Sequence, residues 1–166
     1  MQQSISLDGV IAFLVSTPLF DGLDSIERAD VARILEVSRF KAQDAVFREG
    51  EPGDAWYVIA EGTARVLKQG AGSTSEVARL DAGDCFGEMA ILDGSARSAT
   101  VEAVTPLTLY RFRRARFEEL LEQGSLGAYK LVLAMARTLS KRQRELTRQV
   151  AELSAGGANP RYVVSE

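Results

Sequence analysis

The chain has 166 residues, of which 46% are hydrophobic and 26% charged, enough for one ordinary domain with an appendage and too few for a second large domain. It contains no histidine and a single cysteine, Cys85, which excludes Ser-His-Asp and Cys-His catalysis, histidine-bound metals, internal disulfides and cysteine-built metal sites. We therefore expect a reducing compartment and a protein that is not an enzyme and holds no metal or cofactor. Cys85 is expected to be a small buried core residue, because no neighbouring cation in the sequence would lower its pKa.

The amino-terminal segment shows no signal for export or membrane insertion. The first eight residues carry no positive charge, and the apolar run that follows, 10–15, has only six residues. A signal peptide needs a basic start and a longer apolar core, and a membrane span needs roughly 18 to 20 apolar residues. We expect a cytoplasmic protein with no membrane span.

Residues 1–36 are expected to form an amino-terminal helical segment. Asp24 and Glu27 have the spacing of a helix N-cap and its N3 partner, and an apolar helical face follows them. Residues 17–23, which contain a proline and a glycine, are interpreted as a kinked connector between two helical stretches.

Short β-like runs follow, separated by turns rich in glycine, proline and aspartate. These runs are residues 37–40, 45–47, 56–60, 64–67, 75–80, 98–104 and 107–112. Many short strands at this spacing predict an antiparallel jelly roll or barrel of about eight strands over residues 37–113. With the flanking helices, the fold class is α+β.

Helices are predicted again over residues 114–153. Gly124 breaks the pattern after a short amphipathic stretch, and a long helix is expected from Ser125 to about Leu153. Residues 154–166 offer little apolar surface to bury, so this tail is expected to be disordered.

The long carboxy-terminal helix carries apolar residues at alternating spacings of three and four, which is a heptad seam. The seam consists of Tyr129, Val132, Ala136, Leu139, Gln143, Leu146, Val150 and Leu153. A seam of this length is longer than a small β domain can cover, so we expect a parallel homodimer through this helix. The alternative is that the helix folds back on its own domain and the seam is the core-facing stripe.

Charge is distributed unevenly along the chain. Residues 109–150 hold 10 Lys or Arg against 4 Asp or Glu, whereas residues 1–108 hold 9 against 17. We interpret the basic stretch as the solvated face of a helix. Contact with an acidic partner or with nucleic acid is the alternative.

A candidate anion site lies in residues 83–100, where one helical turn is expected between two strands. The backbone amides from Gly87 to Ala90 would point toward one spot at the start of that turn, and a glycine allows close approach. Arg97 can offer a planar fork of donors to a phosphate, and Glu88 can accept a hydrogen bond from a vicinal hydroxyl. This combination suits a sugar phosphate better than a bare phosphate.

These same residues resemble the phosphate-binding cassette of the cyclic nucleotide-binding domain family. The matching segments are Phe-Gly-Glu-Met-Ala at 86–90 and Arg-Ser-Ala at 97–99, within a cassette at 86–99. The resemblance extends over about residues 10–150, because 47–54, Gly62 and 83–84 also fall where the family places its strand turns. The family includes regulatory subunits of cyclic-nucleotide-dependent kinases, gated channels and the catabolite activator protein.

The resemblance implies specific roles for the cassette residues. Glu88 would hold the ribose 2′-hydroxyl, and Arg97 would hold the cyclic phosphate. The Ser98 hydroxyl and the backbone amides of Gly87 and Ala90 would assist Arg97.

The resemblance also implies contacts to the base. Val66 and Val77 are expected to line the base pocket, and Met89 to help close it. Serine at position 98 favours cAMP, since threonine there is typical of the cGMP-preferring branch, although cGMP stays open. The resemblance also implies a base contact from the last helix or from a lid, with Leu126, Tyr129, Lys130 and Val132 as the candidates.

The leading hypothesis is therefore a regulatory module that binds a cyclic nucleotide and transmits occupancy through the carboxy-terminal helix to a dimer interface or a partner protein. A non-binding interaction protein, whose coiled coil recruits a partner, is the alternative. In that case Arg97 would pair with a surface carboxylate and Glu88 would compensate a helix dipole. Direct DNA binding is not expected, because 13 residues follow Leu153.

Overall fold

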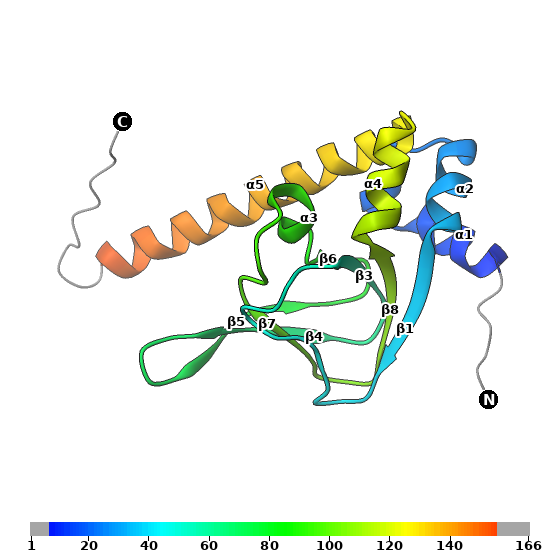
Figure 1. Ribbon diagram of the computed structural model, residues 1–166. Helices are drawn as coiled ribbons and strands as arrows, with labels where there is room; N and C mark the ends of the chain where they lie inside the picture. The colour runs from blue at the N-terminus through cyan, green and yellow to red at the C-terminus, as the bar shows by residue number, and fades with distance from the viewer. Residues whose placement is uncertain (1–6, 156–166) are drawn as a thin grey trace.

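A two-sheet β domain carries helices along one side, and the last helix extends well beyond it (Figure 1). The structure, a computed structural model, describes residues 7–155. Its helices are α1 (Leu7–Ser16), the 3-10 helix η1 (Pro18–Phe20), α2 (Ser25–Arg33), α3 (Met89–Asp93), α4 (Arg114–Glu122) and α5 (Leu126–Ala155). Its strands are β1 (Leu35–Phe40), β2 (Ala45–Phe47), β3 (Ala55–Glu61), β4 (Ala64–Gln69), β5 (Thr74–Leu80), β6 (Cys85–Phe86), β7 (Thr100–Ala103) and β8 (Leu107–Arg113).

The predicted capping box at the start of α2 is confirmed. Asp24 accepts hydrogen bonds from the backbone N–H groups of Ile26 and Glu27, both at 2.9 Å. The Glu27 carboxylate in turn accepts the Asp24 N–H at 2.8 Å, so two otherwise unpaired donors of the first turn are satisfied. Helix α2 ends at Arg33 and β1 begins at Leu35, so the helical segment ends slightly before the predicted residue 36.

The strands form two antiparallel sheets, in the orders β1-β8-β3-β6 and β2-β7-β4-β5. The predicted antiparallel jelly-roll fold is thereby confirmed. Strand β6 was not among the predicted runs; it pairs only Phe86 with Tyr57 and Cys85 with Val58 of β3. Two residues are too few to show the alternation by which a strand is recognised in a sequence.

Strand β3 is buried on both faces and separates two hydrophobic clusters. Trp56 and Val58 belong to the cluster shared with the helices, whereas Tyr57 and Ile59 belong to the cluster between the sheets. Because successive side chains of a strand point to opposite faces, this one strand contributes to both cores. Trp56 stacks on Phe112 of β8, its direct neighbour in register, with ring centroids 4.1 Å apart.

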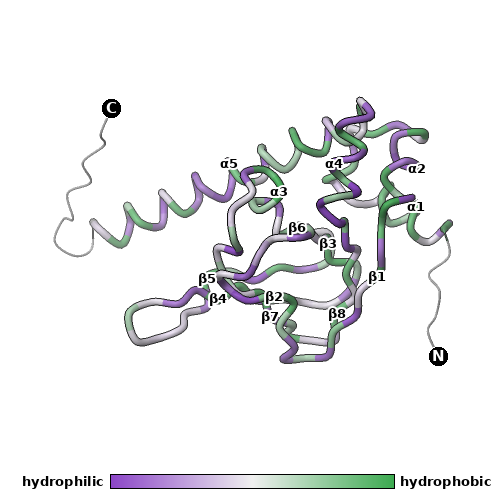
Figure 2. The backbone as a smooth tube through the Cα atoms, viewed as in Figure 1, coloured by the Kyte–Doolittle hydropathy of each residue, from purple (hydrophilic) through white to green (hydrophobic). Residues whose placement is uncertain are grey.

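Helix α5 has a packed near half and an unpacked far half. Ala128, Leu131 and Met135 are fully buried against the helical cluster. Leu146 and Val150, by contrast, are exposed on the part that extends away from the sheets in Figure 1. Figure 2 shows apolar and polar residues alternating along that far half.

The buried stripe of α5 lies one position before the predicted seam. The near half of α5 does pack on its own domain, as the alternative expected, but Tyr129 and Ala136 of the seam are exposed, so the seam is not the core-facing stripe. The homodimer stays a prediction. Helix α5 continues through Ala155, and the rest of the tail expected to be disordered, 156–166, lies outside the described residues. Within residues 7–155, no helix is both long and apolar enough to cross a membrane.

Candidate functional site

The expected single helical turn is present as α3, between β6 and β7. Gly87 precedes it with φ of +77°, a left-handed conformation that favours glycine. A Cβ atom at Gly87 would also lie 2.8 Å from Nη1 of Arg97. The turn at 49–54 closes on α3, because a Cβ atom at Gly53 would overlap with Cβ of Ala90. Both glycines therefore allow the cassette to fold tightly around Arg97.

The Arg97 side chain is directed into the β domain and is only 2% exposed. Its Nη1 donates to the carbonyl oxygen of Gly87 at 3.1 Å and its Nη2 to that of Ala55 at 2.7 Å. The guanidinium lies over the ring of Phe47, 4.0 Å from the centroid. Burial lowers the pKa of Arg97 from its usual value, since the charged form loses hydration there.

This buried cation is incompletely neutralised. Within residues 7–155 its Nε has no hydrogen-bond partner, and the carboxylate that forms an ion pair with it is Asp54, with Oδ1 3.6 Å from Nη2. The Asp54 side chain is 65% exposed and pairs more closely with Arg111, at 2.6 Å. A buried arginine with a spare donor and a shared, solvated counter-ion is suited to bind an anion.

Glu88 is also buried, and its partner comes from α5. Nη1 of Arg142 donates to Oε1 of Glu88 at 3.0 Å, and Nη2 donates to the carbonyl oxygen of Cys85 at 2.7 Å. Burial raises the pKa of Glu88 above its usual value despite this cation. The segment 88–97, which includes α3, thus carries a hydrogen-bond acceptor, Glu88, at one end and a hydrogen-bond donor, the Arg97 guanidinium, at the other.

The other expected site residues differ in their surroundings. The Ser98 hydroxyl lies 3.8 Å from the Met89 sulfur. Val66 is half-buried on β4 and packs against the cluster between the sheets. Val77 is 51% exposed. It has no partner on β4, because the register shifts there: Val66 pairs with Ala78, and Leu67 pairs with Glu76.

The last-helix residues expected near the base have other contacts. Lys130 donates to both carboxylate oxygens of Glu27, and the Tyr129 hydroxyl donates to the carbonyl oxygen of Leu121. Leu126 is exposed and Val132 is half-buried. These positions precede Arg142 by ten or more residues, about 15 Å or more along the helix axis.

Sequence reasoning missed Arg142 and Asp54 as site residues. Arg142 is 54 positions from Glu88 and Asp54 is 43 positions from Arg97, so no local spacing signals either contact. In the sequence, the acidic turn at 49–54 is recognisable only as a strand turn. Arg142 was one of several basic residues on a helix, with nothing in the sequence to distinguish it.

The expected burial of Cys85 is confirmed. Burial raises the pKa of its thiol to about 12, so it is a neutral core group rather than a nucleophile. Among residues 7–155, no group of three or more Cys, Asp or Glu side chains is arranged to hold a metal ion.

Known proteins with similar sequences point to one family. The family model described as a cyclic nucleotide-binding domain matches residues 37–124, more than half of the chain. The chain is 37% identical over 110 residues to a cAMP-dependent protein kinase regulatory subunit of Emericella nidulans. That match covers 66% of this chain and 26% of the relative, so the chain spans about a quarter of the relative's length.

Solved structures show the same fold. The regulatory domain of Toxoplasma gondii PKA, crystallised with cAMP, is 30% identical with a TM-score of 0.72, and the match covers 81% of this chain and 50% of that one. A cyclic nucleotide-binding domain from Methylobacillus flagellatus has a TM-score of 0.79 at 22% identity, covering 92% of this chain and 86% of that one. The second likeness bears on the fold alone. The family resemblance carried by residues 86–90 and 97–99 is confirmed: this chain belongs to the cyclic nucleotide-binding domain family.

Proposed function

We propose that this chain binds cAMP and acts as a regulatory module rather than an enzyme. One observation carries the proposal: the guanidinium of Arg97 is buried between the cassette and β3, and within residues 7–155 its Nε has no partner. A ligand phosphate would supply the charge that Asp54, at 3.6 Å, supplies only in part. The regulatory domain from Toxoplasma gondii, with cAMP bound, supports the choice of ligand.

In this proposal, different cassette residues bind different groups of the ligand. Arg97 takes the cyclic phosphate, with the Ser98 hydroxyl and the backbone amides of Gly87 and Ala90 as further donors. Glu88 accepts the ribose 2′-hydroxyl. Its raised pKa supports this role, because an additional donor would stabilise the desolvated carboxylate.

The base would cover apolar side chains near the cassette. Val66, Val77 and Met89 carry this contact in our proposal, and both Val77 and Met89 are exposed in the chain. Burial of their surface would contribute affinity independent of the phosphate. Serine rather than threonine at 98 favours cAMP over cGMP.

Occupancy would reach α5 through Arg142. This arginine joins Glu88 to the carbonyl oxygen of Cys85, so a hydroxyl that competes for Glu88 changes how firmly α5 is held. A ligand shifts this equilibrium only as far as it binds one arrangement of the helix better than the other. The output is then a population shift of α5.

The receiver of that output would be a second copy of the chain or a separate protein. The far half of α5 exposes Leu146, Val150 and Leu153, which continue the heptad seam. A parallel homodimer would cover these side chains. We propose that the module is cytoplasmic and acts through such contacts, without direct DNA binding.

Calorimetric titration with cAMP, cGMP and AMP tests the proposal. We expect cAMP to bind and AMP, which lacks the cyclic phosphate, to bind far more weakly. Arg97→Ala should weaken cAMP binding by about 2 to 5 kcal/mol, because a desolvated phosphate loses its charged partner. That corresponds to roughly 30-fold to several-thousand-fold in the dissociation constant.

Arg33→Ala is the matched control, since Arg33 is an exposed arginine on α2 that pairs with Asp30. It should leave the cAMP affinity unchanged. If folded wild-type chain binds none of the three nucleotides, the β domain is a non-binding scaffold. The alternative, an interaction protein that acts through α5, then takes its place.

A further inference from the structure

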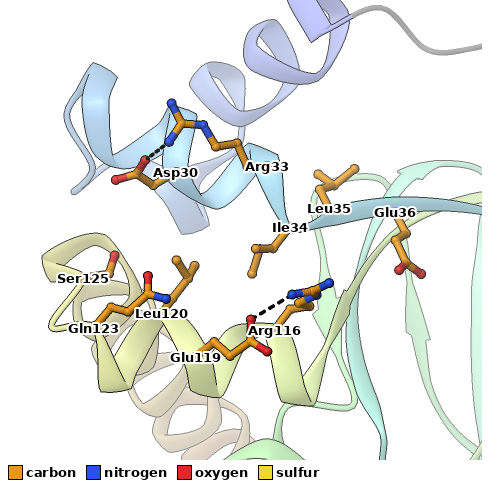
Figure 3. A pocket seen from close by; sticks show the side chains of 10 residues that line it. All are labelled: Asp30, Arg33, Ile34, Leu35, Glu36, Arg116, Glu119, Leu120, Gln123 and Ser125. Carbon is orange, nitrogen blue, oxygen red and sulfur yellow. Dashed lines mark hydrogen bonds and ion pairs between the residues drawn. The ribbon is translucent and has the colours of Figure 1, made fainter.

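Two surface hollows lie outside the cassette, and their charges differ. Figure 3 shows the first, a cavity of about 580 Å³ between α2, β1 and α4. Its two arginines are each paired with an acidic residue on the same helix: Arg33 with Asp30 at 2.8 Å, and Arg116 with Glu119 at 3.0 Å. These pairs leave little unbalanced charge to attract a ligand.

The second hollow, which we call the α5 groove, has a volume of about 760 Å³. One wall is the side of α5 that carries Lys130, Leu133, Arg137 and Lys141. The opposite wall is formed by η1 with the turn after it and by the connection from β5 to β6. None of the cassette residues from Gly87 to Ser98 lines it, so it is separate from the proposed nucleotide site.

The α5 wall presents two unbalanced cations. Lys130 is bonded to Glu27, but the side chains of Arg137 and Lys141 have no ion pair or hydrogen bond with the described residues 7–155. They are four positions apart, so they lie one above the other on the same face, with Cβ atoms about 5 to 6 Å apart. Two carboxylates on one segment could reach both.

The opposite wall contains the acidic residues Asp21 and Asp84. Asp84 accepts the backbone N–H of Asp81 at 2.9 Å. Within the described chain, no ion pair joins either aspartate to Arg137 or Lys141 across the groove. A polyanion such as a nucleic-acid backbone would be repelled by this wall, whereas a peptide segment can turn its acidic side chains toward α5 alone.

Apolar surface in the groove fits a peptide as well. Leu133 is 51% exposed beside the two cations, and Leu19 of η1 lies on the opposite wall. An apolar side chain inserted between them would gain burial that a free inorganic anion could not.

The side of the groove that carries Arg137 and Lys141 faces away from a dimer formed through the heptad seam. At 100° per residue, positions 130, 134, 137 and 141 lie on the opposite side of α5 from 132, 136, 139 and 143. Arg142, which also lines the groove, holds Glu88 of the cassette. A segment bound beside it would therefore contact the helix that the nucleotide site controls.

We propose that the α5 groove docks an acidic segment of a partner protein, with carboxylates on Arg137 and Lys141 and an apolar side chain on Leu133. This deepens the partner role in the proposed function, on which its regulatory meaning rests. The docking itself needs no nucleotide.

The probe is a library of random twelve-residue peptides displayed on phage and selected against the folded full chain. We expect the enriched peptides to combine at least two acidic residues with a large apolar one. Synthetic copies, labelled and followed by fluorescence anisotropy, should lose at least tenfold in affinity for the Arg137→Glu/Lys141→Glu variant. Leu133→Ser should weaken the same peptides by a smaller factor.

The matched control is Arg33→Glu/Arg116→Glu, which makes the same change in net charge at the cavity of Figure 3. It should leave peptide binding within twofold. The proposal is overturned if no acidic peptide is enriched, or if the enriched peptides bind the Arg137→Glu/Lys141→Glu variant as tightly as the wild type. Binding of a single-stranded oligonucleotide that depends on Arg137 and Lys141, and that the selected peptides do not displace, would also overturn it.

Calorimetric titration of the same variants with cAMP separates the two proposals. The Arg137→Glu/Lys141→Glu variant should keep its cAMP affinity within about threefold, which also shows that it is folded. If the wild-type chain binds cAMP but none of the acidic peptides, the docking proposal alone is rejected. Peptide binding by a chain that does not bind cAMP rejects the nucleotide proposal alone.

Discussion

In the described part of the chain, 7–155, two ion pairs join α5 to other elements, and their α5 residues are twelve positions apart. Lys130 donates to Glu27 of α2 at 2.8 and 2.9 Å. Arg142 donates to Glu88 of the cassette at 3.0 Å. The first pair joins the helices to one another, and the second joins α5 to the candidate site.

The two carboxylates respond to their surroundings in opposite ways. The hydrogen bond from Lys130, together with the Asp24 N–H, lowers the pKa of Glu27 below its usual value of 4.5. Burial raises the pKa of Glu88 above the same value, because desolvation outweighs the opposing effect of Arg142 and Arg97. Glu27 is therefore satisfied by the fold, whereas the Glu88 carboxylate would still be stabilised by another donor. The second pair is therefore the one that a ligand hydroxyl can rearrange.

The largest expected difference is in how leucine-to-alanine substitutions in the near and far halves of α5 change the free energy of unfolding. Leu131→Ala should lower the free energy of unfolding by about 2 to 5 kcal/mol, because a fully buried side chain leaves a cavity. Leu146→Ala should change it by no more than about 0.5 kcal/mol in dilute protein, since Leu146 is exposed. Urea denaturation measures both.

The same two variants sharpen the dimer proposal. In sedimentation velocity, Leu146→Ala should weaken self-association while Leu131→Ala acts through folding. Equal losses of stability in dilute protein would show that the far half is packed as the near half is.

A smaller difference in the free energy of unfolding is expected between substitutions of Arg142 and of Lys130. Arg142→Met should cost about 1 to 3 kcal/mol, because it leaves a buried carboxylate without its partner. Lys130→Met should cost less, since Glu27 keeps the Asp24 N–H and lies nearer the solvent. Thermal unfolding at neutral pH compares them, and a larger loss for Lys130→Met would reverse our assignment of the two pairs.

The smallest expected effects are on the pH dependence of stability. Glu27 has a lowered pKa, so its stabilisation is complete above pH 4.5 and is lost as the pH falls through the folded value. Glu88 has a raised pKa, so the folded chain binds its proton more tightly than the unfolded chain does. Its contribution is complete below 4.5 and is lost as the pH rises through the folded value.

Urea denaturation across this acidic range, with Glu27→Gln and Glu88→Gln, checks the signs. Glu27→Gln should reduce the loss of stability on acidification. Glu88→Gln should reduce the loss on raising the pH. A Glu88→Gln profile parallel to that of the wild type would contradict the raised pKa.

Much of the fold could be predicted because its signals are local. The Asp24 capping box, the break at Gly124 and the short strands between turns each depend on neighbours within a few residues. Strand β6 escaped prediction because its two residues form a strand only through pairing with Tyr57 and Val58. The start of β1 at Leu35 was set by pairing with Phe112, a partner distant in sequence.

The candidate site divides in the same way. The segment that contains Gly87, Glu88 and Arg97 could be recognised because its residues are close in sequence and their chemistry suits a sugar phosphate. The position of Val77 could not be foreseen, because a register shift between β4 and β5 leaves it unpaired with β4.

The family, the cassette and the periodicity of the last helix can be recognised in the sequence, since each is a pattern of nearby residues. The inward direction of Arg97, the contact of Arg142 with Glu88 and the choice of the buried stripe of α5 depend on tertiary packing. They do so because these contacts join residues tens of positions apart. Their geometry depends on how sheets and helices pack, and no local spacing encodes that packing.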